Sequence, residues 1–357
     1  MVSMLDCIKR VPSLLDVIIE KREETFSELF NKYGERLIKT DEIVLVGSGT
    51  SNTSAITAKY LAEKAAGVRV TVVTPNEFIN CLTYRNREAL YLFVSQTGTS
   101  KLTLKALDIA EENGWMTGTI SEASTTPAAQ GAGAYINMGC GREEYPMRTI
   151  GYSTTVLTIM LLGMELGRRK GFLKEKDCLD YICQAKRAAT NIEAVIEKTM
   201  AWLDTDRRNM MQADCIVFTG AGALYGVALE GAVKVWETPQ IISMGYELEE
   251  GMHGPNFGYT HRHCVLVLND GGVDRDRAIS MCKFMKFEKN NGFMLGADAV
   301  DSHDLSFELR GGEFSCLEFA AAVQVISYRL ALEQGRDLFA PHDNRAMMSY
   351  FQSHASN

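Results

Sequence analysis

The sequence predicts an α/β protein with two similar domains, each a parallel sheet flanked by helices on both faces, as in a three-layer sandwich. Short apolar strand patterns alternate with longer helical patterns, which is typical of parallel sheets. A strand–glycine–helix pattern occurs twice, first from residue 43 and again from residue 215. The length of 357 residues is enough for two domains at roughly 150 residues each.

The first half of the chain carries the more complete pattern. Residues 3–35 have apolar side chains at helical spacing and predict helices that precede the first core. The strands expected after them are 43–46, 68–73, 90–94, 116–120 and 134–138. The helices expected between these strands are 51–66 and 101–113. A long helical stretch follows from 154 to 204, with an interruption near Gly171.

The second half repeats part of this pattern, with a strand at 215–218, a helix at 224–236 and a strand at 264–268. An offset of 173 positions aligns three features, namely Gly49 with Gly222, Glu77 with Glu250, and Ser95 with Leu268. A constant offset indicates the duplication of one α/β unit. The expected division is N-terminal helices at 1–40, a first domain at 41–170, a helical linker at 171–210, and a second domain with a C-terminal tail at 211–357.

Composition and charge exclude several classes of partner and site. Hydrophobic residues make up 46% of the chain and charged residues 23%, which is typical of globular proteins. The net charge of −8, without a basic block, argues against nucleic acid and anionic membranes as partners. The N-terminus lacks a signal-peptide core, and the longest apolar stretch, 156–164, is too short to span a bilayer. Nine scattered cysteines without a C-x-x-C pattern favour free thiols, no metal site and a cytoplasmic protein.

A loop rich in hydroxyl groups follows the strand at 90–94. Ser95-Gln-Thr-Gly-Thr-Ser100 places hydroxyls and free N–H groups at the start of a helix, where an anion binds favourably. The corresponding loop of the second copy is followed by Asp274 and Asp276, whose carboxylates would repel a phosphate. We therefore expect one phosphate site per chain, in the first half.

A dinucleotide cofactor is a competing interpretation of Gly47-Ser-Gly49. The third glycine of the G-x-G-x-x-G fingerprint is replaced by Asn52. Thr74-Pro75 stands where the acidic residue that binds the ribose is expected. NAD is therefore disfavoured, and no cofactor is expected.

The motifs taken together resemble the tandem sugar isomerase (SIS) domain family. The resemblance rests on residues 47–51, residues 95–100, Glu237 and His253-Gly-Pro255, and it covers roughly residues 40–345. This family includes the isomerase half of glucosamine-6-phosphate synthase and the deglycases that cleave fructoselysine 6-phosphate or glucoselysine 6-phosphate. The resemblance implies a phosphosugar substrate and a homodimer with active sites at the subunit interface, because in such relatives the histidine comes from the neighbouring subunit.

The resemblance also assigns roles to individual positions. The residues that match the phosphate loop are Ser95, Gln96, Thr97 and Ser100. The residues that match the loops lining the sugar site are Gly49, Thr50, Ser51, Met147, Arg148 and Thr149. The residues that match the catalytic positions are Lys234, Glu237 and His253. In the family the glutamate moves a proton between C1 and C2, and the histidine serves ring opening or protonation of the leaving group.

The chemistry of the residues agrees with the two principal roles. Glu237 precedes Thr238-Pro239, which ends a helix, so its carboxylate is expected at the carboxyl edge of the sheet, where α/β proteins bind ligands. A desolvated glutamate can act as the base beside a carbonyl group. His253 can exchange protons near neutral pH. His261 and His263 are expected on opposite faces of a strand, which disfavours a metal site.

Two departures from the synthase pattern bear on the activity. No cysteine follows the initiator Met and no glutaminase precedes the first domain, so ammonia production is not expected. The last lysine of the sequence is Lys289, so a Schiff base through a C-terminal lysine is not expected either. A deglycase needs neither feature, because its substrate already carries nitrogen. We therefore expect a deglycase; an aldose–ketose isomerase or amino-sugar phosphate deaminase is the alternative, and a phosphosugar-binding regulatory module is a third hypothesis.

Overall fold

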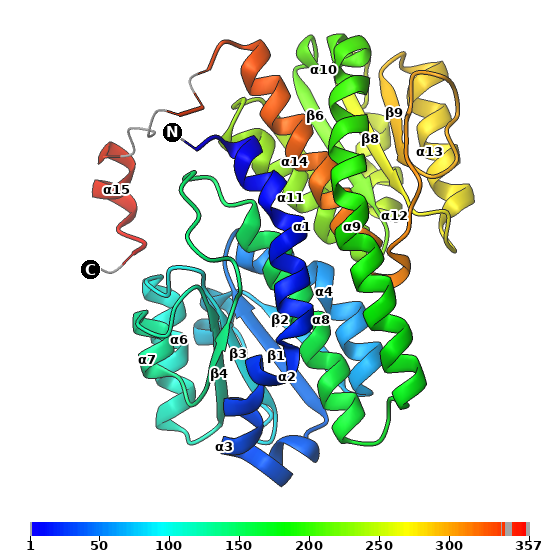
Figure 1. Cartoon of the computed structure of the whole chain (residues 1–357). Helices are drawn as coiled ribbons and strands as arrows, with labels where there is room; N and C mark the ends of the chain where they lie inside the picture. Colours follow the sequence, from blue (N-terminus) through cyan, green and yellow to red (C-terminus); the bar gives the residue numbers. More distant parts are fainter. Residues whose placement is uncertain (1, 337, 340–344, 355–357) are drawn as a thin grey trace. The chain divides into compact units, whose positions relative to one another are not determined.

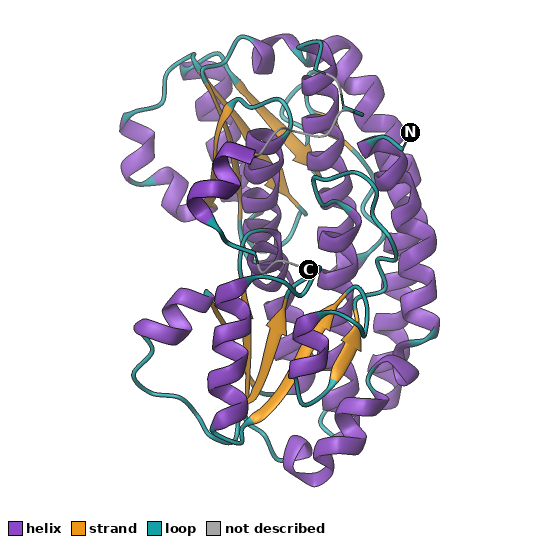
Figure 2. Ribbon diagram, turned by 90° about the vertical axis from the view of Figure 1, so that its left-hand side faces the viewer, coloured by secondary structure: helices purple, strands orange, loops and turns teal. Residues whose placement is uncertain are grey.

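The computed structural model describes residues 2–336, 338, 339 and 345–354, and its contacts divide the chain into two compact units. The first-sheet unit comprises Leu14–Pro146, Ile150–Ile182 and the described part of Ala340–Asn357. The second-sheet unit comprises Met147–Thr149 and the described parts of Met1–Ser13 and Cys183–Phe339. This grouping differs from the expected division at both ends of the chain, because the N-terminal helices are shared between the units and the described tail contacts the first-sheet unit. Within each unit, helices cover the sheet (Figure 2).

The first sheet is parallel and has the strand order β2-β1-β3-β4-β5 (Figure 1). Its strands are β1 (Glu42–Gly47), β2 (Arg69–Val73), β3 (Leu90–Val94), β4 (Met116–Ser121) and β5 (Tyr135–Asn137). Every residue of β3 and β4 is buried, because helices lie on both faces of a parallel sheet. Phe78, Tyr91 and Phe93 form the aromatic part of the core on one face.

Helices connect the strands of the first sheet and complete the first-sheet unit. They are α2 (Arg22–Thr25), α3 (Ser27–Ile38), α4 (Thr50–Ala66), α5 (Pro75–Asn80), α6 (Lys101–Glu112), α7 (Pro127–Gly131), α8 (Ile150–Arg169) and, in the tail, α15 (Arg345–Phe351). Two further helices have residues in both units, α1 (Met4–Glu20) and α9 (Glu175–Asp206). The interruption expected near Gly171 is confirmed, because the chain takes a positive φ of 71° there, between α8 and α9.

The second sheet repeats the strand order of the first. Its strands are β6 (Cys215–Gly220), β7 (Ile242–Glu247), β8 (His263–Asn269), β9 (Gly292–Gly296) and β10 (Leu305–Ser306), in the parallel order β7-β6-β8-β9-β10. The helices and 3₁₀ helices of this unit are α10 (Arg208–Met211), α11 (Ala223–Glu237), α12 (Leu248–Met252), η1 (Gly254–Phe257), α13 (Arg275–Glu288), η2 (Gly312–Phe314) and α14 (Ser315–Glu333).

The duplication inferred from the constant offset is confirmed. Read from β7, the second sheet has the order of the first, with β6 in the place of β1 and β8 in the place of β3. Gly49 and Gly222 each precede the first residue of a helix with nearly the same backbone angles, φ 58° and ψ −131° against φ 56° and ψ −127°. A positive φ of this kind favours glycine, which explains why both copies have it at this turn.

Two helical segments require a correction to the membrane argument. The apolar stretch 156–164 lies inside α8, whose 20 residues are long and apolar enough to cross a membrane, as is the segment Gly312–Glu333. The apolar windows of these segments are 100% and 83% buried in the protein itself. Such burial is the ordinary behaviour of core helices, so length and composition alone make weak evidence for a span.

All nine cysteines lie among the described residues, and no disulfide joins any two of them there. Seven of them are buried, whereas Cys81 and Cys183 are exposed. Burial raises the pKa of the Cys282 and Cys316 thiols to about 12, so both are inert in the core.

Candidate functional site

The loop at residues 95–100 lies between the carboxyl end of β3 and the first residue of α6. The Ser95 N–H donates to the Ile120 carbonyl of β4 at 3.1 Å, and the Gly98 N–H donates to the Ser95 carbonyl at 3.1 Å. Because Gly47 of β1 pairs with Val94 of β3, the loop that follows β1 starts beside this one. The structure therefore brings together the two groups of residues that the sequence assigned to the phosphate loop and the adjoining sugar loop, namely Ser95, Gln96, Thr97 and Ser100 with Gly49, Thr50 and Ser51.

Gly98 gives this loop its turn. Its φ is +62°, and a Cβ placed there would lie 2.5 Å from the Thr126 Cβ, so both conformation and space require glycine. The loop also orders its own hydroxyls, since Thr97 Oγ1 and Thr99 Oγ1 are 2.9 Å apart and Thr103 donates to Ser100 Oγ at 3.0 Å.

We expect Gly98→Ala to lower the free energy of unfolding by more than the roughly 1–2 kcal/mol that a left-handed alanine costs, and to weaken phosphate binding. Gly114→Ala is the matched control, because Gly114 has φ +67° and nothing within 4 Å of the added Cβ. Urea denaturation and phosphate titration of both variants measure the two effects. Equal behaviour of the variants would contradict a role for the Thr126 contact.

Gln96 is held by a buried carboxylate that sequence analysis missed. Its Nε2 donates to Glu143 Oε2 at 3.3 Å. Glu143 also accepts hydrogen bonds from the Ile150 N–H at 2.9 Å and the Gly151 N–H at 3.2 Å, at the start of α8. A carboxylate at a helix N-terminus is stabilised by the unpaired N–H groups there. Glu143 therefore links the conformation of the loop at residues 95–100 to α8.

The C-terminal tail contacts the same loop. The Lys101 N–H, the first of α6, donates to the Ser353 carbonyl at 3.0 Å, and Ser100 forms an isolated antiparallel bridge with His354. Thr99 Oγ1 lies 3.2 Å from His354 Nδ1. The tail was expected to belong to the second domain; its described residues instead occupy one of the N–H groups that an anion at α6 would use, while residues 340–344 and 355–357 lie outside the described residues.

We expect a chain truncated after Phe339 to bind inorganic phosphate more tightly than the full chain. Release of one hydrogen bond, worth about 0.5–1.5 kcal/mol, corresponds to a gain of roughly two- to tenfold in affinity. His354→Ala is the control, because it keeps the Ser353 carbonyl bond to Lys101. Titration calorimetry with phosphate measures all three proteins, and an unchanged or lower affinity after truncation would contradict competition by the tail.

The second-sheet unit holds the Lys-x-x-Glu pair on α11. Lys234 is fully buried, and its Nζ lies 2.6 Å from Glu237 Oε2 and 3.4 Å from Glu230 Oε1. Glu230 is also fully buried, whereas the Glu237 side chain is 32% exposed. Residues three and four positions apart share one face of a helix, so this triad follows from the sequence spacing. The Glu237 carboxylate is thus held through Oε2 by the Lys234 ammonium group, and its side chain remains partly exposed.

The end of α11 is fixed by hydroxyl groups. α11 ends at Glu237, as the Thr238-Pro239 pair predicted. The hydroxyl groups of Thr238 and Ser327 bond to each other and to the Lys234 carbonyl, with Ser327 Oγ 2.6 Å from that oxygen. The Lys234 carbonyl also accepts the Thr238 backbone N–H at 3.0 Å, so backbone and hydroxyl donors converge on it at the helix end. They hold the backbone on which the Lys234–Glu237 pair depends.

His253 is not hydrogen-bonded to Glu237 within the described chain. It follows α12 directly, its side chain is 69% exposed, and its Nε2 lies 2.9 Å from Glu249 Oε1. Glu249 is held in turn by Arg277 Nη1 at 2.6 Å. Sequence analysis did not identify Glu249, although its position four residues before the histidine on a helix was a usable signal.

Residues 147–149 immediately precede α8 and belong by contacts to the second-sheet unit. Met147 and Arg148 are half-buried and Thr149 is buried. The Thr149 carbonyl accepts a hydrogen bond from Gln324 Nε2 of α14 at 3.3 Å. The structure thus places these three predicted sugar-lining residues with the unit that carries Glu237.

The loop after β8 corresponds to the loop at residues 95–100 but is occupied by ion pairs. Asp274 pairs with Arg277, and Arg275 pairs with Asp298 at 2.9 Å. Among the residues that the structure describes, no group of three or more His, Cys, Asp or Glu side chains is placed to hold a metal ion.

Comparisons with known proteins find similarity to one domain family and to a group of curated enzymes. The model of the SIS domain matches residues 36–164. The glutamine–fructose-6-phosphate aminotransferase (isomerizing) of Bacteroides thetaiotaomicron is 26% identical over 320 residues, which are 87% of this chain and 52% of that protein. The chain thus spans about half the length of the curated relatives it matches.

Solved structures show the same fold. A Clostridium difficile protein regarded as a phosphosugar isomerase superimposes with a TM-score of 0.88 at 24% identity, covering 98% of both chains. The C-terminal domain of the glucosamine–fructose-6-phosphate aminotransferase of Francisella tularensis superimposes with a TM-score of 0.84 at 20% identity, covering 95% of this chain and 98% of that one. Residues 36–164 therefore match the SIS-domain model, and the chain as a whole shares the two-sheet fold of these two structures.

Proposed function

We propose that this protein is a deglycase that cleaves a 6-phosphorylated sugar–amino acid conjugate, such as fructoselysine or glucoselysine 6-phosphate, into a hexose 6-phosphate and a free amine. The single observation that carries the proposal is the Lys234–Glu237 pair, in which a buried ammonium group holds a partly exposed carboxylate at the end of α11. A carboxylate held in this way can remove a proton next to a carbonyl group without moving.

The phosphate of the substrate is assigned to the loop at residues 95–100. This loop offers the hydroxyls of Ser95, Thr97 and Ser100 and the N-terminal N–H groups of α6 that follow Lys101, whose own N–H bonds to Ser353, all without a large positive field. The net charge of −8 is compatible with such a site, because the binding energy comes from local dipoles and hydroxyl groups.

The surroundings of Lys234 favour acid–base chemistry over a Schiff base. Two carboxylates, Glu230 and Glu237, stabilise the ammonium form of Lys234, which is not a nucleophile. The sequence has no lysine after Lys289. A substrate that already carries an amine on the sugar needs no lysine to activate its carbonyl.

The proposed reaction balances with water as the only co-reactant. For a conjugate with nitrogen on C1, Glu237 takes a proton from C1, the electron pair forms the C1=C2 bond of an enaminol, and O2 gains a proton. Return of a proton to C2, with loss of the proton on nitrogen, leaves an imine between C1 and nitrogen. Water adds to C1, the C–N bond breaks, and the amine leaves with the proton that His253 delivers.

His253 is proposed to act from the neighbouring subunit of a homodimer. Its side chain is 69% exposed and bonds to Glu249, not to Glu237 of its own chain. An exposed histidine of this kind is accessible to a second copy. In a mixed dimer of one Glu237→Gln chain and one His253→Asn chain, this arrangement leaves one of the two sites intact. Mixed dimers without the activity of that intact site would contradict it.

An aldose–ketose isomerase is the second candidate. The observation that favours it is the fold shared with the Clostridium difficile protein regarded as a phosphosugar isomerase. The same glutamate would move a proton between C1 and C2 of a sugar phosphate, without a C–N bond to break.

A time course by NMR in heavy water separates these activities. Purified protein is incubated with fructoselysine 6-phosphate, glucoselysine 6-phosphate or fructose 6-phosphate. Release of lysine with a hexose 6-phosphate is the expected result. Deuterium entering C1 or C2 of fructose 6-phosphate, with no amine released from either conjugate, would replace the deglycase by the isomerase, and neither signal would contradict both enzymes.

A further inference from the structure

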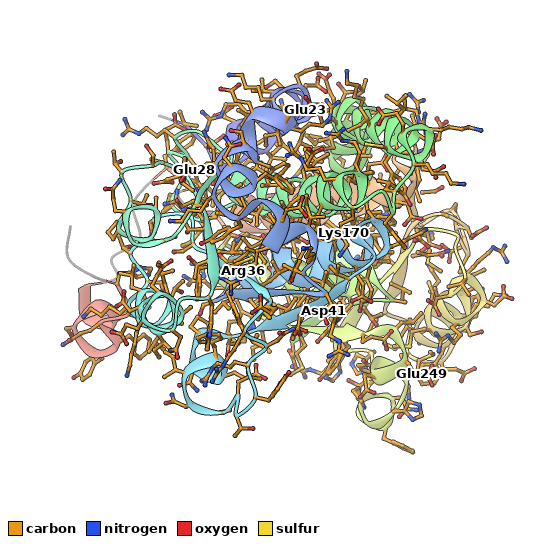
Figure 3. All side chains as sticks on the ribbon, turned by 90° about the horizontal axis from the view of Figure 1, so that it is seen from below. Glu23, Glu28, Arg36, Asp41, Lys170 and Glu249 are labelled. Carbon is orange, nitrogen blue, oxygen red and sulfur yellow. The ribbon has the colours of Figure 1, made fainter. Side chains whose placement is uncertain are left out.

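Glu249 and Arg277 form a connected set of side chains with His253, one of the three predicted catalytic residues. Glu249 lies on α12 at the periphery of its unit (Figure 3), and its Oε1 is 2.9 Å from His253 Nε2. Its second oxygen, Oε2, accepts from Arg277 Nη1 of α13 at 2.6 Å. Arg277 also pairs with Asp274, which precedes α13. The carboxylate is thus fixed from both sides, and the histidine is held by a group that is itself held.

The bond between Glu249 and His253 determines which ring nitrogen carries the proton. The hydrogen bond from His253 lowers the pKa of Glu249, desolvation raises it by less, and the bond and charge of Arg277 lower it further, so the carboxylate stays ionised at neutral pH. An ionised carboxylate only accepts hydrogen bonds. Nε2 must therefore be the donor, and in the neutral ring Nδ1 is the nitrogen with a free lone pair.

The other nitrogen is available for chemistry. Among the described residues Nδ1 of His253 has no hydrogen-bond partner, and the side chain is 69% exposed. A carboxylate that fixes one nitrogen of an imidazole sets its tautomer and orientation and stabilises the imidazolium ion formed during proton transfer. In this set of side chains Glu249 would fix Nε2 of His253 in the same way and leave Nδ1 to exchange protons.

We infer that Glu249 and Arg277 are positioning residues that hold His253 with a proton on Nε2, so that His253 exchanges protons with substrate through Nδ1. This inference rests on the proposed role of His253 in the reaction, but its tautomer can be measured without substrate. Glu249 and Arg277 do not touch the reacting atoms; they act through the histidine.

The test combines ¹⁵N NMR of histidine-labelled protein with kinetics of Glu249→Gln. The signals of His253 are identified among the six histidines by comparison with His253→Asn. We expect the wild-type neutral ring to be the Nε2–H form, and Glu249→Gln to give a mixture, because an amide can either donate or accept. We expect kcat to fall about 10- to 100-fold with little change in KM, less than the contribution of a complete acid–base group.

Two further variants make the result specific. Arg277→Gln leaves Glu249 in place but unfixed, and we expect a smaller fall in kcat with the tautomer largely kept. Asp276→Asn is the matched control, because Asp276 lies next to Arg277 on α13 but pairs with Arg275. It is expected to leave both measurements unchanged.

The outcomes also separate this inference from the proposed function. A wild-type ring that is already a mixture of tautomers, or a Glu249→Gln variant with wild-type kcat, overturns the inference. Full activity of His253→Asn overturns both the role of the histidine and the inference. Absence of turnover in the wild type with every phosphosugar tested overturns the proposed function. The NMR measurement of the tautomer then still decides which ring nitrogen of His253 carries the proton.

Discussion

Glu237→Gln is expected to lower kcat by roughly 10²–10⁴-fold while leaving the affinity for a hexose phosphate unchanged. The amide keeps the size of the carboxylate but cannot take a proton from carbon. The phosphate is assigned to the loop at residues 95–100, which does not include Glu237, so binding is expected to persist. Steady-state kinetics and a titration with hexose 6-phosphate measure the two quantities separately.

The control for this variant is Glu288→Gln. Glu288 is also the last residue of a helix, α13, and it is exposed. Its change removes one carboxylate without touching the Lys234–Glu237 pair. Glu237→Gln with wild-type kcat would remove Glu237 from the mechanism, and a parallel loss in both variants would show a general effect of charge.

Lys234→Met is expected to lower the free energy of unfolding by about 3–5 kcal/mol, because it leaves a buried carboxylate without its counter-charge. Glu230 is fully buried, and Lys234 is the cation next to it in α11. Combining Lys234→Met with Glu230→Gln removes both buried charges and is expected to recover much of the loss. Urea denaturation of the single and double variants measures this.

Lys283→Met is the control for the lysine change. Lys283 is exposed on α13, so its substitution is expected to change the stability by less than about 0.5 kcal/mol. A loss of unfolding free energy below about 1 kcal/mol for Lys234→Met would contradict a buried ion pair between Lys234 and Glu230. Equal losses in the single and double variants would show that packing of the lysine chain, not its charge, is what matters.

The first sheet was largely predictable because its strands are short apolar runs between glycines and helices. The expected strand at 90–94 coincides with β3, and the strand at 43–46 differs from β1 only at its ends. In the second sheet β7 was missed, because its burial alternates irregularly and its sequence carries no continuous apolar run. β10 has only two residues and gives no pattern at all.

The candidate site was predictable where its residues are neighbours along the chain. The Lys-x-x-Glu pair follows from helical spacing, and the Glu230–Lys234 pair could have been found in the same way. The contact between Gln96 and Glu143 joins residues 47 positions apart, and that between Thr99 and His354 joins residues 255 positions apart. Neither contact is part of a local repeat in the sequence, so no sequence pattern predicts it.

The sequence by itself determined the duplicated α/β unit, the turn glycines of both copies and the position of the hydroxyl-rich loop. These features depend on hydrophobic periodicity and on backbone conformations that only glycine adopts readily. The tertiary structure alone decided that Glu143 holds Gln96, that the tail carbonyl of Ser353 occupies the first N–H of α6, and that Arg277 holds Glu249. Side-chain partners of this kind are chosen by which polar groups folding brings within hydrogen-bond distance, and that distance is set by packing and not by position along the chain.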